Sequence, residues 1–353
     1  MVERMKIAQI SPLAESVPPR LYGGTERIVS YLTEELMRQG HKVTLFASGD
    51  SRTAAELYPV VNTALRFAPQ VRDAHIFTLL QFEAVRARAA EFDVIHFHTD
   101  YLHFPLLREL QLRNAVTTLH GRLDLPGYPE MFARHPEPAV VSISNDQRRP
   151  LPHANWAGTV HHGLPGQVCA YQPERRDGYL AFLGRISPEK RVDRAIEIAR
   201  RAGMKLRIAA KVDAVDREYF VSRIEPLLAQ PHVEFVGEIA EHAKCDFLGN
   251  AHALLFPIDW PEPFGLVLIE AMSCGTPTVA WRAGSVPEII SEGSNGFIVD
   301  TIDDAVAAVQ RCAQIDRAAV RAVFEQRFTV QRMTRDYLEI YRRLTRRAGR
   351  VAA

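Results

Sequence analysis

Short apolar runs alternate with segments of helical periodicity along the chain, and this alternation is the feature that most limits the fold. The first example runs from a strand at Lys6–Ile10, through a loop rich in proline and glycine at 11–24, to a helix at 25–39 and a strand at 43–47. Gly40 stands where a left-handed helix C-cap belongs. This order of elements is a βαβ unit, which predicts parallel strands with helices on both faces of the sheet.

The alternation occurs in two blocks. Further strands are predicted at 94–97, 115–119 and 140–143, and then at 179–183, 206–210, 233–236, 253–256 and 278–281, with a helix at 192–202. The stretch 155–172 between the blocks holds several Gly, Pro and His residues without periodicity, and we interpret it as a linker. A chain of 353 residues is also long enough for about two domains. We therefore expect an α/β fold of two doubly wound Rossmann-like domains, 1–160 and 161–329, facing each other across a ligand cleft, with a C-terminal helix at 330–349 packed back on the first.

The charge balance argues against a general nucleic-acid binder. Lys and Arg number 43 and Asp and Glu number 42, so the net charge is +1. A protein that binds the phosphate backbone generally carries a strong excess of basic residues. Nucleic acid is therefore not an expected partner.

The cysteines and the absence of long apolar runs suggest an intracellular setting. Four cysteines are far apart and form neither a CxxC pair nor a dense, even framework: Cys169, Cys245, Cys274 and Cys312. We therefore expect reduced thiols. The sequence has no signal-peptide pattern at its start and no run of about 18 apolar residues. A cytoplasmic location is the resulting expectation.

The strongest candidate for an anion site is the segment 184–191, which follows a predicted strand. The sequence predicts that a helix begins at Pro188, which places Lys190 and Arg191 in its first turn. Cations at the start of a helix interact unfavourably with the helix dipole, at a cost of about 0.3–1 kcal/mol each. Residues that are locally unfavourable in this way often mark a functional site. Together with Arg185, these groups could bind two adjacent phosphates. A solvated basic helix start is the alternative.

A second candidate segment spans residues 260–277. Its part 264–274 is apolar on all sides, which predicts a buried helix whose only charge is Glu270. A buried carboxylate requires hydrogen-bond donors, supplied either by a structural partner such as an arginine or by a ligand. Glu262 precedes the helix, and Gly265 would let a ligand approach backbone N–H groups. Helical spacing puts the two carboxylates about 12 Å apart, beyond the roughly 5–9.5 Å of a glycosidase pair, so we interpret them as acceptors for two hydroxyl-bearing parts of one extended ligand.

Two weaker candidates lie in the first half of the chain. Gly23 and Gly24 precede a helix and would let backbone lie against a phosphate, although a plain tight turn is the more common reason for a Gly-Gly pair. His120 follows a predicted strand and could contact a reacting group, or it could simply cap the strand. No carboxylate at a suitable spacing supports a metal site at the cluster of His96, His98 and His103.

Taken in order, four motifs resemble those of the retaining glycosyltransferases of family 4. They are Tyr-Gly-Gly-Thr-Glu at 22–26, His-Gly at 120–121, Gly-Arg with a following lysine at 184–190, and Glu-x7-Glu from Glu262 to Glu270. The resemblance covers nearly the whole chain. It implies the GT-B fold, in which two Rossmann-like domains face each other. It also implies a nucleotide sugar as co-substrate, with no cofactor and no metal.

The resemblance also implies roles for single residues. Arg185 and Lys190 would hold the donor diphosphate, which Gly23 and Gly24 would approach as well, with Lys211 near the phosphates. Glu262 and the backbone of Phe264, Gly265 and Leu266 would hold sugar hydroxyls, and Glu270 the ribose. His120 would lie near the transferred sugar, and the stretch from Val236 to Ile239 would border the nucleobase.

The expected activity is therefore retaining transfer of a hexose to an acceptor hydroxyl. UDP-glucose is the favoured donor and GDP-mannose the next. Loops at 50–72 and 122–134 would choose among a saccharide, a lipid-linked intermediate and a small metabolite, and the sequence leaves the acceptor and the oligomeric state open. Weak contact with an anionic membrane could involve four arginines of the first half: Arg66, Arg72, Arg86 and Arg88.

Other functions remain as alternatives. A nucleotide-sugar epimerase has the same architecture, and so does a glycogen-type phosphorylase, for which no pyridoxal-binding lysine context is found. A non-catalytic protein that binds sugar nucleotides is the third alternative. A dehydrogenase, a P-loop NTPase and an α/β-hydrolase lack their motifs, since GxGxxG, GxxxxGK[ST] and GxSxG do not occur.

Overall fold

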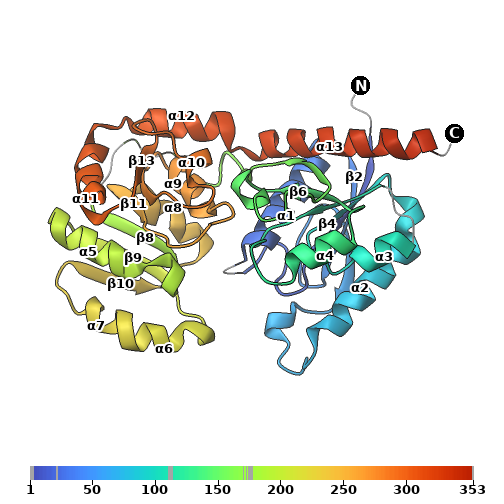
Figure 1. The fold of residues 1–353 in the computed structure, drawn as a ribbon, viewed down its shortest axis with the longest axis horizontal. Coiled ribbons are helices and arrows are strands. Elements are labelled where there is room, and N and C mark those ends of the chain that lie inside the picture. Colours follow the sequence, from blue (N-terminus) through green and yellow to red (C-terminus); the bar gives the residue numbers. More distant parts are fainter. Residues whose placement is uncertain are drawn as a thin grey trace. The chain divides into compact units, whose positions relative to one another are not determined.

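The computed structural model describes residues 4–20, 23–109, 114–169, 171, 173 and 178–351, so Tyr22 of the first motif lies outside the described residues. The chain divides into two compact units (Figure 1). Unit 1 comprises residues 1–163 and 330–353, and unit 2 comprises residues 164–329.

Unit 1 is built on a parallel sheet of seven strands in the order β3-β2-β1-β4-β5-β6-β7. The strands are β1 (Lys6–Ile10), β2 (Lys42–Ser48), β3 (Glu56–Val61), β4 (Val94–Phe97), β5 (Ala115–Thr118), β6 (Ala139–Ser142) and β7 (Trp156–Thr159). The helices are α1 (Gly24–Arg38), α2 (Ala74–Arg88), α3 (Phe104–Glu109), α4 (Tyr128–Arg134) and α13 (Val330–Val351).

The sequence prediction missed two strands of this sheet. β3 contains Pro59, a residue that normally argues against a strand, and it lies at the sheet edge, where proline is tolerated. β7 lies within the predicted linker, so the interpretation of 155–172 as a linker is wrong for that part. Gly158 of β7 serves close packing, because a Cβ there would lie 3.3 Å from Cδ1 of Ile340 on α13. The glycine that suggested a loop marks a close approach between a strand and a helix.

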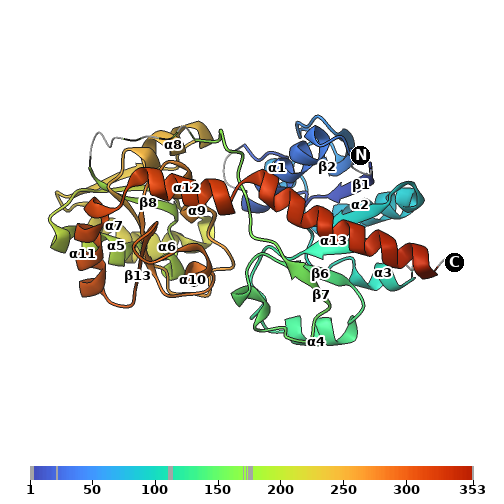
Figure 2. The ribbon, with the colours of Figure 1, turned by 90° about the horizontal axis from the view of Figure 1, so that it is seen from above.

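The C-terminal helix α13 belongs to unit 1. It packs against α1 and β4, and both Figure 1 and Figure 2 show it running along unit 1. Tyr337 and Tyr341 are fully buried in this packing. Gly40 takes the predicted left-handed conformation after α1, with φ of 87°.

Unit 2 is built on a second parallel sheet, with six strands in the order β10-β9-β8-β11-β12-β13. The strands are β8 (Leu180–Arg185), β9 (Leu206–Lys211), β10 (Val233–Gly237), β11 (Ala253–Phe256), β12 (Thr278–Trp281) and β13 (Gly296–Val299). The helices are α5 (Val192–Ala202), α6 (Arg217–Tyr219), α7 (Glu225–Leu228), α8 (Glu241–Gly249), α9 (Leu266–Ser273), α10 (Val286–Ile289), α11 (Ile302–Arg311) and α12 (Arg317–Arg327).

Both sheets have the strand order of a doubly wound Rossmann fold. In such a sheet, ligands bind beyond the carboxyl ends of the strands, at the point where the strand order reverses. That point lies between β1 and β4 in unit 1 and between β8 and β11 in unit 2. The predicted α/β class with two doubly wound halves is confirmed.

Candidate functional site

The candidate residues of unit 2 gather along the carboxyl edge of its sheet. Arg185 ends β8, and the loop that carries Glu262 follows β11, the strand across the switch point. Lys211 ends β9, and Val236 lies in β10, with Ile239 just beyond it. The sheet topology therefore brings distant segments of the sequence to one edge, where a ligand of this fold is expected.

Arg185 lies among three carboxylates. Its Nη2 donates to Oε1 of Glu189 over 2.8 Å, and its other nitrogens lie 3.7 Å from Asp213 and 3.8 Å from Asp216. Burial raises the pKa of Asp216, and the charge of Arg185 opposes that rise. The guanidinium is thus balanced by acids, and its side chain keeps 30% of its surface exposed. An arriving phosphate would compete with these carboxylates for the arginine.

The prediction that a helix begins at Pro188 is wrong for the first turn. Pro188–Lys190 forms a short 3₁₀ turn, and α5 begins only at Val192. The break comes at Arg191, which takes the left-handed conformation with φ of 52°. Its guanidinium donates to Asp193 and to Asp259 over 2.8 Å each. Lys190 therefore lies on a separate turn before α5, and Arg191 is engaged in structural ion pairs.

Lys190 is paired with Glu262. Its Nζ donates to Oε2 of Glu262, and the two side chains are only 15% and 11% exposed. The ammonium also lies over two aromatic rings, 4.7 Å from the centroid of Trp260 and 5.7 Å from that of Phe256. Removal of either charged partner would leave a largely buried, uncompensated charge.

The loop that carries Glu262 is held by tight backbone packing. Gly284 has φ of 54°, and a Cβ there would lie 2.3 Å from the carbonyl oxygen of Glu262. The same carbonyl accepts the backbone N–H of Ser285, whose Oγ donates to the carbonyl of Phe264. The position of Glu262 therefore depends on a contact that only glycine permits.

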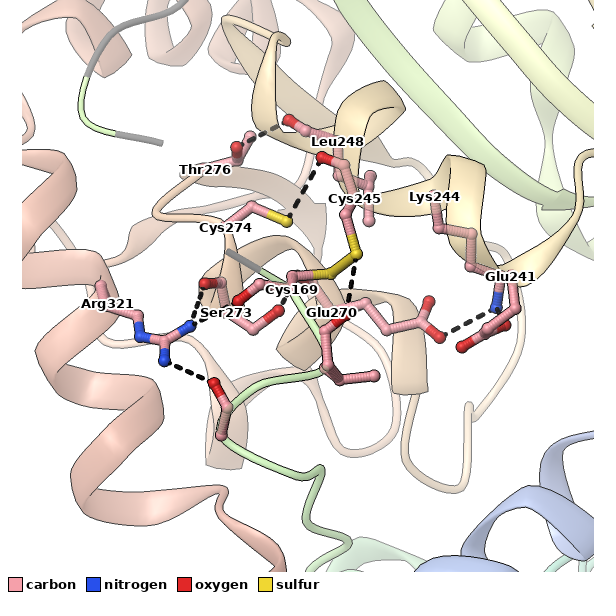
Figure 3. The surroundings of a disulfide bond; sticks show 12 residues. Cys169, Glu241, Lys244, Cys245, Leu248, Glu270, Ser273, Cys274, Thr276 and Arg321 are labelled. Carbon is pink, nitrogen blue, oxygen red and sulfur yellow. Dashed lines mark hydrogen bonds and ion pairs between the residues drawn. A yellow bond between two sulfur atoms is a disulfide. The ribbon is translucent and has the colours of Figure 1, made fainter. Parts of the chain in front are cut away.

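Glu270 of α9 is buried, as predicted, and has a structural partner. Nζ of Lys244, on α8, donates to Oε1 of Glu270 over 3.0 Å and also lies 2.9 Å from Oε2 of Glu241 (Figure 3). Lys244 thus takes the place of the arginine considered as a structural partner. The predicted buried helix is somewhat shorter than 264–274, because Gly265, with φ of 80°, is the N-cap of α9. Glu262 and Glu270 bind different lysines and do not form a carboxylate pair.

Cys169 and Cys245 form a disulfide, so the prediction of reduced thiols is wrong for these two residues. Their Cα atoms lie 5.2 Å apart, although 76 positions separate them in the sequence. Cys245 follows Lys244 on α8, which places the disulfide beside the ion pair with Glu270 (Figure 3). Cys274 and Cys312 are free and buried. Spacing in the sequence could not reveal this pairing, because the fold alone brings the two segments together.

The remaining candidate residues of unit 2 have mixed surroundings. Nζ of Lys211 lies 2.8 Å from Oδ1 of Asp213, one of the acids near Arg185. Val236 and Ile239 are half-buried. Phe264 is buried and packs edge-on against Phe328, and the backbone of Leu266 begins α9.

The candidate residues of unit 1 are Gly23, Gly24 and His120. Gly23 is the N-cap of α1, and a Cβ there would lie 2.8 Å from the Cβ of Pro19, which explains the glycine by packing. Gly24 is the first residue of α1. Nε2 of His120 is hydrogen-bonded to Nδ1 of His98 over 2.8 Å, and burial lowers the pKa of His120 to about 3. His120 is therefore a neutral imidazole at physiological pH.

His96 and His103 of unit 1 are hydrogen-bonded to other side chains of the same unit. His96 contacts Tyr341 and Thr118, and His103 contacts Thr117, through hydrogen bonds of 2.6–2.8 Å. Within the described ranges, no three His, Cys, Asp or Glu side chains gather in a way that could hold a metal ion. No helix of the described chain is long and apolar enough to cross a membrane.

Comparison with known proteins identifies the family. The model of Glycosyltransferase Family 4 matches residues 22–179, and that of Glycosyl transferases group 1 matches residues 171–318. The chain is a family 4 glycosyltransferase. This family is the one that the four motifs indicated, although the comparisons do not test the role of any motif residue.

Relatives support this assignment over most of the chain. Glycogen synthase of Mycobacterium tuberculosis is 25% identical, with 91% of this chain and 89% of the relative covered. Phosphatidyl-myo-inositol mannosyltransferase of Mycobacterium leprae is 25% identical over 86% of each chain. The crystal structure of AviGT4, a glycosyltransferase involved in avilamycin A biosynthesis, matches with 26% identity, a TM-score of 0.75 and 98% of both chains covered. The fold of this glycosyltransferase is therefore GT-B.

Several residues of the site were not found from the sequence. Lys244 and Glu241 carry no motif signal, because a lysine on a polar helix is common. Trp260 stood within the segment singled out, but a contact between its ring and Lys190 depends on the path of the loop. These residues are visible only in the folded chain.

Proposed function

We propose that this glycosyltransferase moves a hexose from a nucleoside diphosphate sugar to an acceptor hydroxyl with retention of anomeric configuration. The observation that carries the proposal is the position of Arg185 and Lys190 at the switch point of unit 2, each held by carboxylates. Departure of a nucleoside diphosphate leaves negative charge, which preplaced cations stabilise without reorganisation.

Each group has a distinct role in the proposed reaction. Arg185 and Lys190 bind the diphosphate, and Lys211 contributes charge at the next strand end. Their charge replaces that of a divalent metal ion. Glu262 accepts hydrogen bonds from hydroxyls of the sugar, and Glu270 from those of the ribose. Within unit 1, the proposal assigns Gly23 and Gly24 to the diphosphate and His120 to the transferred sugar.

Retention follows if the acceptor hydroxyl attacks from the side on which the diphosphate leaves. No carboxylate is assigned as a base, because Glu262 and Glu270 are each engaged with a lysine. The departing phosphate would take the proton of the acceptor. Proton NMR of the product in the first minutes of the reaction distinguishes retained from inverted anomers.

The donor is proposed to be UDP-glucose, with GDP-mannose as the second candidate. A screen of nucleotide sugars by thermal shift tests this choice, because a ligand that binds only the folded state raises the melting temperature. Stabilisation by UDP-glucose above that by UDP alone supports the proposal, whereas no shift with any nucleotide sugar contradicts it. Product formed without an acceptor would favour an epimerase.

The acceptor is proposed to be a saccharide, a lipid-linked intermediate or a small metabolite. One relative is named as a synthase of glycogen and another as a mannosyltransferase of phosphatidyl-myo-inositol, so related chains act on very different acceptors. Of the arginines considered for a membrane surface, Arg66 pairs with Glu15, Arg86 with Glu83 and Arg88 with Glu91. We propose at most a weak peripheral contact with a membrane, because acids already pair with these three arginines.

A further inference from the structure

A buried chain of hydrogen bonds in unit 1 ends at His120. It links β1, β4 and β5 with the C-terminal helix α13, on the sheet face that α13 covers. Its inner members are at most 2% exposed: Gln9, His96, His98, Thr118, Tyr337 and Tyr341. Gln9 and His96 are register partners on neighbouring strands. So many buried polar groups in one place call for an explanation beyond packing.

The bonds of His98 determine where its proton lies. Its Nε2 is 2.8 Å from Oε1 of Gln9, and its Nδ1 is 2.8 Å from Nε2 of His120. An amide oxygen only accepts, so Nε2 of His98 carries the proton and donates. Burial lowers the pKa of His98 well below its ordinary value, so the ring is neutral and its Nδ1 can only accept.

His120 therefore donates from Nε2 to His98. As His120 is also neutral, its Nδ1 carries a lone pair and can only accept a hydrogen bond. Within the described part of the chain, Nδ1 of His120 takes part in no hydrogen bond. The backbone of His120 is held separately, because it bonds to the carboxylate of Asp100.

The nitrogen of the Gln9 amide faces Tyr341 of α13. Nε2 of Gln9 donates to the hydroxyl of Tyr341 over 3.2 Å. The Tyr341 oxygen lies 2.6 Å from Nδ1 of His96, whose Nε2 lies 2.7 Å from Oγ1 of Thr118. Because the Tyr341 oxygen accepts from Gln9, its own proton goes to His96. A helix more than three hundred positions away from Gln9 thus helps to determine which way that amide points.

We propose that Gln9 and Tyr341 are positioning residues that hold His120 as the Nε2–H tautomer, so that its Nδ1 accepts a hydrogen bond from a hydroxyl of the transferred sugar. This inference rests on the proposed function, because it takes a sugar as the ligand of His120. The proposed tautomer requires that the ligand group at Nδ1 of His120 donates a hydrogen bond, since the lone pair on Nδ1 repels an oxygen that can only accept. It also gives α13 a part in the reaction besides packing.

The tautomer can be measured without substrate. Long-range ¹H–¹⁵N NMR of histidine-labelled full-length protein shows which ring nitrogen carries the proton, and His120→Ala assigns the His120 signals. We expect a single Nε2–H tautomer for His120 and for His98. In Gln9→Met, and independently in Tyr341→Phe, we expect loss of this single tautomer.

Tyr337→Phe is the matched control. It removes a second buried hydroxyl from the same helix, but Tyr337 bonds to Thr118, at the end of the hydrogen-bond chain that is farthest from His120. Release of nucleoside diphosphate from UDP-glucose and from GDP-mannose should fall roughly three- to tenfold in kcat/KM in Gln9→Met and Tyr341→Phe, as expected for one misdirected hydrogen bond. Tyr337→Phe should keep both the tautomer and the rate.

The outcomes separate this inference from the proposed function. A wild-type His120 protonated at Nδ1 overturns the inference, and so do Gln9→Met and Tyr341→Phe proteins that keep both tautomer and rate. An equal loss of rate in Tyr337→Phe also overturns it, because the effect would then be general loosening of α13. A wild type that binds no nucleotide sugar contradicts the proposed function, while the NMR result in the free protein still decides the tautomer.

Discussion

The contact between Lys190 and Glu262 supports a prediction in which stability and catalysis respond differently. Lys190→Met and Glu262→Gln are made singly and together. Loss of one partner of a fully buried pair costs about 3–5 kcal/mol. Since the two side chains are 15% and 11% exposed, we expect about 2 kcal/mol of unfolding free energy for each single variant. The double variant should cost less than either single variant, because it leaves no charge unpaired.

Catalysis should not show this compensation. If Lys190 stabilises the leaving diphosphate, Lys190→Met costs about 3 kcal/mol in the transition state, or about 100-fold in kcat/KM. This loss of rate should persist when Lys190→Met is combined with Glu262→Gln, since the positive charge that would face the diphosphate is absent from both proteins. Urea unfolding gives the stability, and coupled detection of released nucleoside diphosphate gives the rate.

The control variant is Arg201→Met. Arg201 forms exposed ion pairs with Glu197 and Asp303 on the same unit, so its loss should leave both stability and activity close to those of the wild type. A Lys190→Met protein that is destabilised yet keeps its turnover within about twofold would refute the assignment of Lys190 to the diphosphate.

Three other predictions concern the disulfide, the buried histidines and the Glu262 loop. Replacement of Cys169 and Cys245 by serine, or reduction, should lower the unfolding free energy by roughly 4 kcal/mol, because the bond closes a loop across 76 positions; a guanidinium titration unchanged by dithiothreitol would contradict this. Buried histidines with lowered pKa bind protons only in the unfolded state below about pH 6.5, so each should remove about 1.4 kcal/mol of stability per pH unit as the pH falls further. A melting temperature that stays flat from pH 7 to 5 would contradict this effect, which sums over His96, His98, His103, His120 and His162. Gly284→Ala should displace Glu262 and raise the donor KM, whereas Gly293→Ala, at φ of 74° with no atom within 4 Å of its Cβ, should cost about 1 kcal/mol of stability and leave KM unchanged.

Periodicity predicted most of the buried strands, although it missed β13 (Gly296–Val299) in unit 2. The strands at Val94–Phe97 and Ala253–Phe256 have the predicted bounds, because a continuous apolar run marks each of them. β3 and β7 lie at the edges of the sheet of unit 1, where half-exposed strands carry proline or glycine. Local sequence cannot distinguish such strands from loops.

The site was predicted in its residue types more fully than in its contacts. The need of Glu270 for a donor follows from its buried helix, but the identity of Lys244 depends on how α8 packs against α9. The turn at Pro188–Lys190 does not continue into α5, because Arg191 takes a left-handed conformation. The side chain of Arg191 forms ion pairs with Asp193 and Asp259. Contacts of this kind join positions far apart in the sequence, and so does the chain from Gln9 to Tyr341.

The central claim is that the cations at the carboxyl edge of unit 2 bind a diphosphate. Titration calorimetry of UDP and GDP, each against its own nucleoside, measures this most directly in the wild type and in Arg185→Met. We expect at least one diphosphate to bind about 100-fold more tightly than its nucleoside, and Arg185→Met to lose most of that difference. Equal affinity for nucleoside and diphosphate in the wild type, or an undiminished difference in Arg185→Met, would contradict the account.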